Sequence, residues 1–102
     1  MKKVLILHDR NGLNFDGVEE FGEPSFIVEA NVHPADIGKI RDATVEAIDH
    51  FGPNDYLLVT ASIVSSIIMG IACSILREYY DHVNVLIFDS KHEKYIERRL
   101  SL

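Results

Sequence analysis

The chain has 102 residues, with ten Lys and Arg against sixteen Asp and Glu and a net charge of −6. This length and an ordinary globular composition predict that residues 1–102 fold as a single α/β domain. The acidic balance argues against a dedicated binder of double-stranded DNA, and we expect no such partner.

The first predicted elements are two strands separated by a long polar loop. Residues 4–7 form a short apolar run followed by turn residues, which is typical of a central strand buried on both faces. The acidic, glycine-punctuated segment from Arg10 to Pro24 predicts a long loop, with room for a short hairpin. Residues 25–32 alternate apolar and polar side chains and predict a half-buried strand.

Two helices and three more strands complete the prediction. Pro34 suits a first helical position, and apolar residues then recur at helical spacing until Gly52-Pro53 ends the helix. The later elements are strand 56–59, helix 62–80, strand 83–88 and a polar strand 94–100. Helical crossovers between apolar strands predict a Rossmann-like, mostly parallel sheet with two helices and an antiparallel C-terminal edge strand.

Residues 56–76 carry no formal charge, a pattern that must be weighed against a membrane span. Hydroxyl side chains interrupt this stretch and the flanking segments fit an α/β sheet, so we expect a strand and a helix and no membrane partner. Cys73 is the only cysteine, and the N-terminal MKKVLILHDR is charged too early for a secretory signal. We therefore expect a cytoplasmic protein without disulfides.

The predicted helix 62–80 is apolar on nearly every side, whereas a helix covering a sheet needs only one apolar stripe. Ser66, Gly70 and Ser74 lie four residues apart and form a ridge of small side chains. Either this helix lies in the interface of a homo-oligomer, which we expect, or its ridge packs on the protein's own sheet.

Open parallel sheets bind ligands at the carboxyl ends of their strands, and polar groups follow three of the predicted strands. Thr60 and Ser62, at the start of helix 62–80, are suited to hold a phosphate, or one of them simply caps the helix. The expected ligand-binding residues are Arg10, Asn11, Thr60, Ser62, Asp89, Ser90, Lys91 and Arg98, and the candidates for acid–base catalysis are His8, Asp9 and His92.

No cofactor and no metal are expected from the sequence. There is no glycine-rich phosphate loop. Asp9, Asn11 and Glu20 match three positions of an EF-hand loop, but the turn position is Asn14 in place of glycine. His92 and Asp89 could share a divalent metal, although their spacing is not characteristic of a metal site.

Residues 55–59 (DYLLV), the helix rich in small residues, and residues 85–89 (VLIFD) with Tyr95 resemble a group of short phage-encoded α/β proteins. More loosely, this part is similar to the small CRISPR-associated ring nucleases of the Csx group, which bind and degrade cyclic oligoadenylate as oligomers. The resemblance covers residues 55–98 and implies the architecture and a nucleotide ligand.

Two functions follow as expectations. The first is a homo-oligomeric binder of an anionic nucleotide or cyclic oligonucleotide, acting as a sponge or as a phosphodiesterase of the ring nuclease type. The alternative is a non-catalytic interaction or inhibitor module that uses the acidic loop 9–23 and the apolar helix 62–80.

Overall fold

Five strands form one mixed sheet in the computed structural model, which describes residues 2–9 and 14–102. The strands lie in the order β2-β1-β3-β4-β5; all neighbours pair in parallel except β4 and β5, which are antiparallel. In chain order the elements are β1 (Lys3–Ile6), η1 (Val18–Glu20), β2 (Glu23–Phe26), α1 (Ile37–Asp49), β3 (Tyr56–Val59), α2 (Ile63–Leu76), β4 (His82–Asp89) and β5 (Lys94–Ser101). The predicted α/β fold, with a mostly parallel sheet, two helices and an antiparallel C-terminal edge strand, is confirmed.

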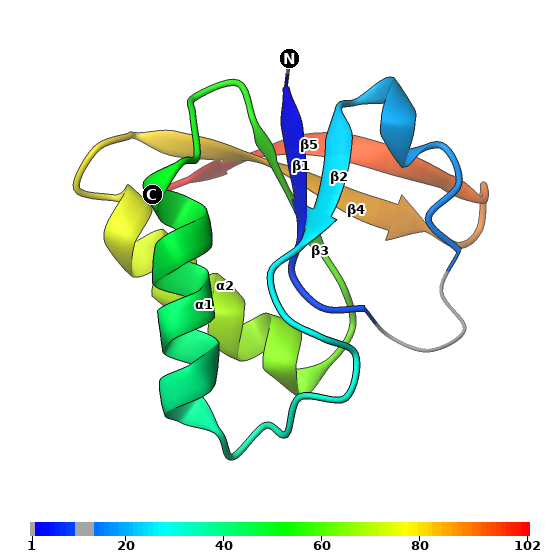
Figure 1. Ribbon diagram of the computed structural model, residues 1–102. Coiled ribbons are helices and arrows are strands. Elements are labelled where there is room, and N and C mark those ends of the chain that lie inside the picture. Colours follow the sequence, from blue (N-terminus) through cyan, green and yellow to red (C-terminus); the bar gives the residue numbers. More distant parts are fainter. Residues whose placement is uncertain (1, 10–13) are drawn as a thin grey trace.

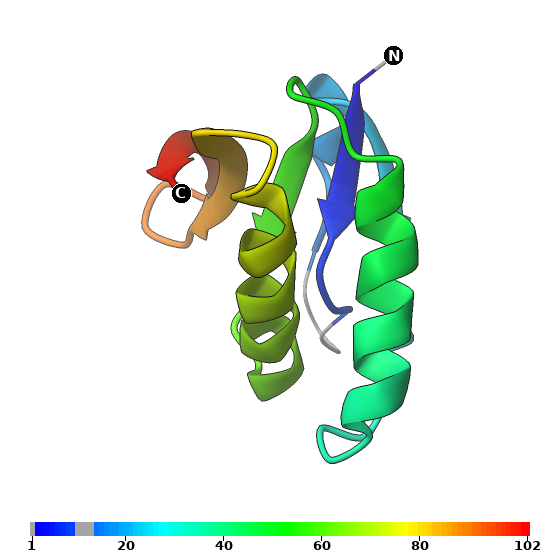
Figure 2. The ribbon, with the colours of Figure 1, turned by 90° about the vertical axis from the view of Figure 1, so that its left-hand side faces the viewer.

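The central strands β1 and β3 bury side chains on both faces. Leu5 and Leu57 belong to a core shared with α1 and α2, whereas Ile6 and Leu58 belong to a second core with Val18 of η1. The two helices lie side by side over one face (Figure 2), and η1 lies on the opposite side of the sheet (Figure 1). Because side chains alternate along a strand, these continuous apolar runs are needed to fill both layers.

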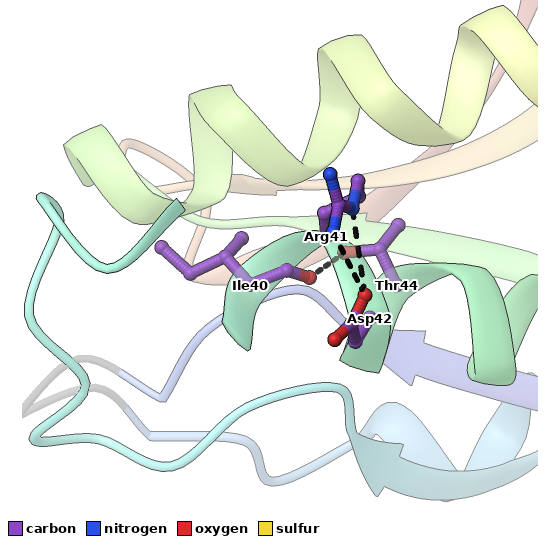
Figure 3. Close-up of polar contacts among 4 residues, drawn as sticks. All are labelled: Ile40, Arg41, Asp42 and Thr44. Carbon is purple, nitrogen blue, oxygen red and sulfur yellow. Dashed lines mark hydrogen bonds and ion pairs between the residues drawn. The ribbon is translucent and has the colours of Figure 1, made fainter. Parts of the chain in front are cut away.

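Helix α1 is amphipathic and covers the sheet with the stripe formed by Ile40, Thr44 and Ile48. The hydroxyl of the buried Thr44 donates to the carbonyl oxygen of Ile40 at 2.8 Å, so it enters the core with its hydrogen bond satisfied (Figure 3). Arg41 and Asp42 form an exposed ion pair at 3.4 Å on the same helix, and such pairs add little stability.

The uncharged stretch 56–76 is divided between β3, a turn and α2, as expected. No helix within the described residues is long and apolar enough to cross a membrane. Helix α2 buries one side, including Val64, Ile68 and Leu76. On its other side Ser66, Gly70 and Ser74 are exposed, so their ridge does not pack on the protein's own sheet.

The second strand and the helix ends differ from the sequence prediction. The strand expected at 25–32 is β2 at Glu23–Phe26. All four of its residues are exposed, because β2 is an edge strand and a pocket separates it from α1. Val28 and Val32 are buried as predicted, but they lie in the connection to α1. The loop expected from residue 10 to residue 24 accordingly ends earlier, before Glu23, and the part of it that the structure describes, residues 14–22, contains η1 and no hairpin.

Both helices are shorter than the sequence suggested. Helix α1 begins at Ile37, after Asp36. Pro34 therefore lies before the helix and does not occupy its first position. The expected helix 62–80 ends at Leu76, because the next residues tighten into a turn: the amides of Glu78 and Tyr79 donate three residues back, to the carbonyl oxygens of Ile75 at 3.2 Å and Leu76 at 2.9 Å. This turn directs the chain into β4.

Candidate functional site

Polar residues from the carboxyl ends of β1 and β3 meet at one place. The hydroxyl of Thr60, after β3, donates to the carbonyl oxygen of His8, after β1, at 2.9 Å. Nδ1 of His8 lies 2.9 Å from Oγ of Ser62. The chain continues from β1 toward one edge of the sheet and from β3 toward the other, so this contact spans the point where the strand order reverses. Open α/β sheets place their ligand crevices at such a point.

The two nitrogens of His8 have different hydrogen-bond partners. Nε2 lies 3.0 Å from the carbonyl oxygen of Ala30, which can only accept, so Nε2 carries a proton. In the neutral imidazole Nδ1 is then the acceptor, and the Ser62 hydroxyl donates to it. His8 is only 8% exposed, so the surrounding chain holds the ring in this orientation.

Ser62 begins helix α2 and caps it. Its backbone is extended, and its Oγ accepts a hydrogen bond from the amide of Ser65 at 3.0 Å. The buried Ser65 hydroxyl in turn accepts from the amide of Thr60 at 3.1 Å. The capping role that the sequence left open between Thr60 and Ser62 therefore belongs to Ser62. The amide groups of the first turn of α2, which have no partner within a helix, make this end favourable for an anion.

A pocket of about 480 Å³, here called the strand-end pocket, lies beside the start of α2. It forms because β4 runs on to Asp89 after its last pairing with β3, between Ile87 and Val59. The hairpin of β4 and β5 thus projects past the end of β3. The pocket is lined by Phe15, Leu58, Val59, Thr60, Ala61, Ile87, Phe88, Ser90 and Tyr95.

Three aromatic side chains, Phe15, Phe88 and Tyr95, contribute to the lining of the strand-end pocket. The rings of Phe88 and Tyr95 meet edge to face with centroids 5.2 Å apart. The Tyr95 hydroxyl donates to the carbonyl oxygen of Asn14 at 2.9 Å, and burial, followed by the nearby Asp16 charge, raises the pKa of this phenol. Phe88 remains 40% exposed, so its ring is available to a flat apolar ligand.

Asp89 and His92 hold the turn of the projecting hairpin. Oδ1 of Asp89 accepts from the amides of Lys91 at 3.0 Å and His92 at 3.4 Å, and Oδ2 lies 2.6 Å from Nδ1 of His92. The hydrogen bond from the His92 side chain is the main reason that the pKa of Asp89 is lowered. His92 thus pairs with Asp89, whereas His8 pairs with Ser62 and Ala30, so the two predicted catalytic histidines belong to separate networks.

The remaining predicted site residues are dispersed. Ser90 lines the strand-end pocket and Lys91 is exposed on the same turn. Asp9 lines a different pocket of about 440 Å³ beside Ala30 and Lys39. Arg98 lies opposite Val85, away from the strand ends, and donates to the carbonyl oxygen of Glu97 at 2.8 Å. The predicted residues Arg10 and Asn11 lie outside the described residues.

Some residues of the site were missed by the sequence analysis. Phe88 and Tyr95 occupy paired positions flanking the turn at 90–93, so the hairpin register could have placed their rings on one face. Phe15 and the Ala30 carbonyl come from irregular segments, for which no sequence pattern gives a position. Within the described part of the chain, no group of three or more His, Cys, Asp or Glu side chains could hold a metal ion.

Comparison with known proteins gives one family. Searches of curated proteins and of solved structures gave no match. The model of the family described as "Phage Pam3 gp32-like protein" matches residues 5–102, which is nearly the whole chain. The expected resemblance to phage-encoded α/β proteins is confirmed in this coarse form, while the match provides no link to the CRISPR-associated ring nucleases. The chain is therefore a member of the Phage Pam3 gp32-like protein family.

Proposed function

We propose that this protein binds a nucleotide, with the base in the strand-end pocket and a phosphate at the start of α2. The observation that carries the proposal is the adjacency of these two features: Thr60 and Ala61 line the pocket and lead directly into Ser62. A flat apolar group and an anion can therefore be bound side by side, and a nucleotide combines the two.

The aromatic wall supports the base half of the proposal. Base–aromatic stacking contributes about 1–3 kcal/mol per base and tolerates any base, because every base has a π face. Phe88 offers an exposed ring, and its edge-to-face contact with Tyr95 fixes the orientation of that ring. Ser90, which is exposed, adds a polar side chain to the lining of the pocket.

The start of α2 supports the phosphate half. Its 14 residues give a full macrodipole, which favours an anion near the first-turn amides. Lys91 and His92, on the turn that carries Ser90, bring basic side chains to the same end of the sheet in a protein of net charge −6. Linear nucleotides and cyclic oligonucleotides share this chemistry, and the resemblance to ring nucleases is the reason to test cyclic oligoadenylate among them.

Thermal unfolding with a nucleotide panel tests the proposal. A ligand at about 100 times its Kd adds about 2.7 kcal/mol of stability and raises Tm by at least about 10 °C in a domain of this size. We expect Phe88→Ala to weaken binding about tenfold or more and Ser62→Glu to abolish the shift by charge repulsion. Tyr79→Ala removes a ring that is 76% exposed outside the pocket and is the matched control.

A second candidate function, an interaction module, is favoured by the exposure of its two surfaces. Glu19 and Glu20 are exposed on η1, in the acidic loop 9–23, and Ile63 of α2 is 69% exposed. This function predicts no stabilisation by any nucleotide. It also predicts that Glu19→Lys with Glu20→Lys abolishes capture of a protein partner while leaving the thermal unfolding of the protein alone unchanged.

A further inference from the structure

We propose that Ser62 is a nucleophile activated by His8, and that the pair cleaves a phosphodiester bond of the bound nucleotide. This inference rests on the proposed function for its substrate class. Nucleotide binding alone requires only the pocket and the start of α2, so the reactivity of Ser62 is a separate property with its own test.

The geometry of the pair fits a serine with its general base. Oγ of Ser62 and Nδ1 of His8 are 2.9 Å apart, within the reach needed for proton transfer. The Ala30 carbonyl holds the Nε2 proton at 3.0 Å and leaves Nδ1 free to accept. A nucleophile, a base and a third group that orients the base are the arrangement by which a serine hydroxyl is activated.

The surroundings stabilise negative charge on the serine oxygen. The amide of Ser65 donates to Oγ of Ser62 at 3.0 Å, and this hydrogen bond strengthens as the oxygen gives up its proton. The positive end of the α2 macrodipole acts in the same direction, both on Oγ and on phosphoryl oxygens beside it. Ser62 is half-buried whereas His8 is buried, so the nucleophile lies between the base and the surface.

A helix cap alone does not require this arrangement. Capping uses the oxygen of Ser62 as an acceptor, a task that Asp or Asn performs equally well. The hydroxyl hydrogen is not needed for the cap, and here it is directed at the one ring nitrogen of His8 that can accept it.

The reaction proceeds in two balanced steps. Oγ of Ser62 attacks phosphorus while its proton moves to Nδ1 of His8; the bond from phosphorus to the leaving ribose oxygen breaks, and that oxygen takes the proton from the imidazolium. Water then attacks the phosphorus of this nucleotidyl-serine, which still carries the other nucleoside, and gives its proton to Nδ1 of His8, while Oγ leaves and recovers this proton. The sum is hydrolysis of one phosphodiester bond.

Covalent labelling with diisopropyl fluorophosphate tests the pair directly in the wild-type protein. We expect one adduct by intact mass, mapped to Ser62 and not to Ser66, which is exposed on the next turn of the same helix. His8→Gln is expected to slow labelling about 100-fold. The matched control His33→Gln, at an exposed histidine whose Nδ1 accepts from the Ala35 amide, should label at the wild-type rate.

Three results would overturn the inference. One is an unlabelled wild-type protein, which requires no variant and is independent of folding defects. The others are equal labelling of Ser62 and Ser66, or an unchanged rate in a folded His8→Gln protein. Nucleotide stabilisation without labelling would leave the proposed function standing and refute this inference, whereas labelling without nucleotide stabilisation would refute the phosphodiester substrate.

Discussion

Tyr56 shows how a single buried side chain makes stability depend on pH. Its hydroxyl donates to Oε2 of Glu97 across the sheet at 2.5 Å, and this hydrogen bond, with burial and the Glu97 charge, raises the pKa of the phenol from 10 to about 12. The folded state therefore favours the neutral phenol. Its contribution to stability is complete below pH 10 and is lost as the pH rises through about 12.

The upward shift of the Tyr56 pKa gives a prediction for Tyr56→Phe. The wild type should lose more free energy of unfolding than the variant as the pH rises between the ordinary pKa of 10 and the shifted value of about 12. Urea unfolding at several pH values across this interval measures the difference. Parallel curves for the two proteins would show that Tyr56 does not titrate in this way.

Asp55 is a second residue whose contribution to the free energy of unfolding can be measured by a single substitution. The residue is 8% exposed, and its carboxylate accepts from the amides of Lys3 and Gly52, each at 2.8 Å. Asp55→Ala leaves both amides without this partner, and we expect a loss of about 3 kcal/mol in urea unfolding. Asp81→Ala, at an exposed position, should stay within about 0.5 kcal/mol of the wild type. An equal effect of both substitutions would contradict the structural role of Asp55.

Among the secondary-structure elements, two glycines have different roles. Gly22 allows two strands to approach closely, whereas Gly38 occupies an ordinary position in a helix. A Cβ at Gly22 would lie 2.5 Å from the carbonyl oxygen of Lys2, which accepts the amide of Glu23 as β2 begins beside β1. A Cβ at Gly38, in the first turn of α1, meets nothing within 4 Å.

Alanine at these two positions should therefore have opposite effects. Gly22→Ala pushes β1 and β2 apart and should cost about 1–3 kcal/mol. Gly38→Ala adds helix propensity and should stabilise the protein by up to about 1 kcal/mol. Denaturant midpoints compare the two variants directly, and a stabilising Gly22→Ala would mean that the start of β2 lies farther from Lys2.

The sequence predicts the bounds of an element well where the element's own pattern of apolar residues determines which side chains are buried. Continuous apolar runs located β1, β3 and β4 to within a residue at each end. The alternation at 25–32 was misleading because Val28 and Val32 are buried by the helices after the edge strand has ended. The end of α2 depends on tertiary contacts: Tyr80 lies beyond Leu76 and its hydroxyl donates to the Phe51 carbonyl at 3.4 Å.

For the candidate site, too, the sequence placed some residues together correctly and misplaced others. That His8, Thr60 and Ser62 meet follows from the rule for parallel strands, once β1 and β3 are known to be neighbours. Arg98 was predicted at the site, with Lys91, as a source of positive charge for an anionic ligand. However, β5 runs antiparallel to β4, so each successive residue of β5 lies farther from the carboxyl end of β4. Arg98 pairs with Val85, four residues before Asp89 at the end of β4.

At the scale of the whole molecule, the outer side of α2 is the surface expected to carry self-association. Ser66, Gly70 and Ser74 are exposed there, and a Cβ at Gly70 meets nothing within 4 Å in the single chain. A ridge of small residues lets a second backbone approach closely, so a bulky side chain at this position would block an assembly.

Gly70→Leu tests this proposal. We expect the wild type to be an oligomer and the variant a monomer by light scattering after size-exclusion chromatography, with unchanged circular dichroism. Val45→Leu, at a position 47% exposed on α1, should keep the wild-type mass. A monomeric wild type, or an unchanged mass for Gly70→Leu, would remove α2 from any interface.

Native mass spectrometry of the wild-type protein shows whether the strand-end pocket and the start of α2 together bind a nucleotide. The panel consists of mononucleotides, linear dinucleotides and cyclic oligoadenylates, each added at equal concentration. We expect at least one nucleotide to be retained in the gas phase by the wild type and by Tyr79→Ala, and to be lost from Phe88→Ala. Spectra that show the bare protein with every nucleotide, or equal retention by Phe88→Ala, would contradict nucleotide binding in the strand-end pocket.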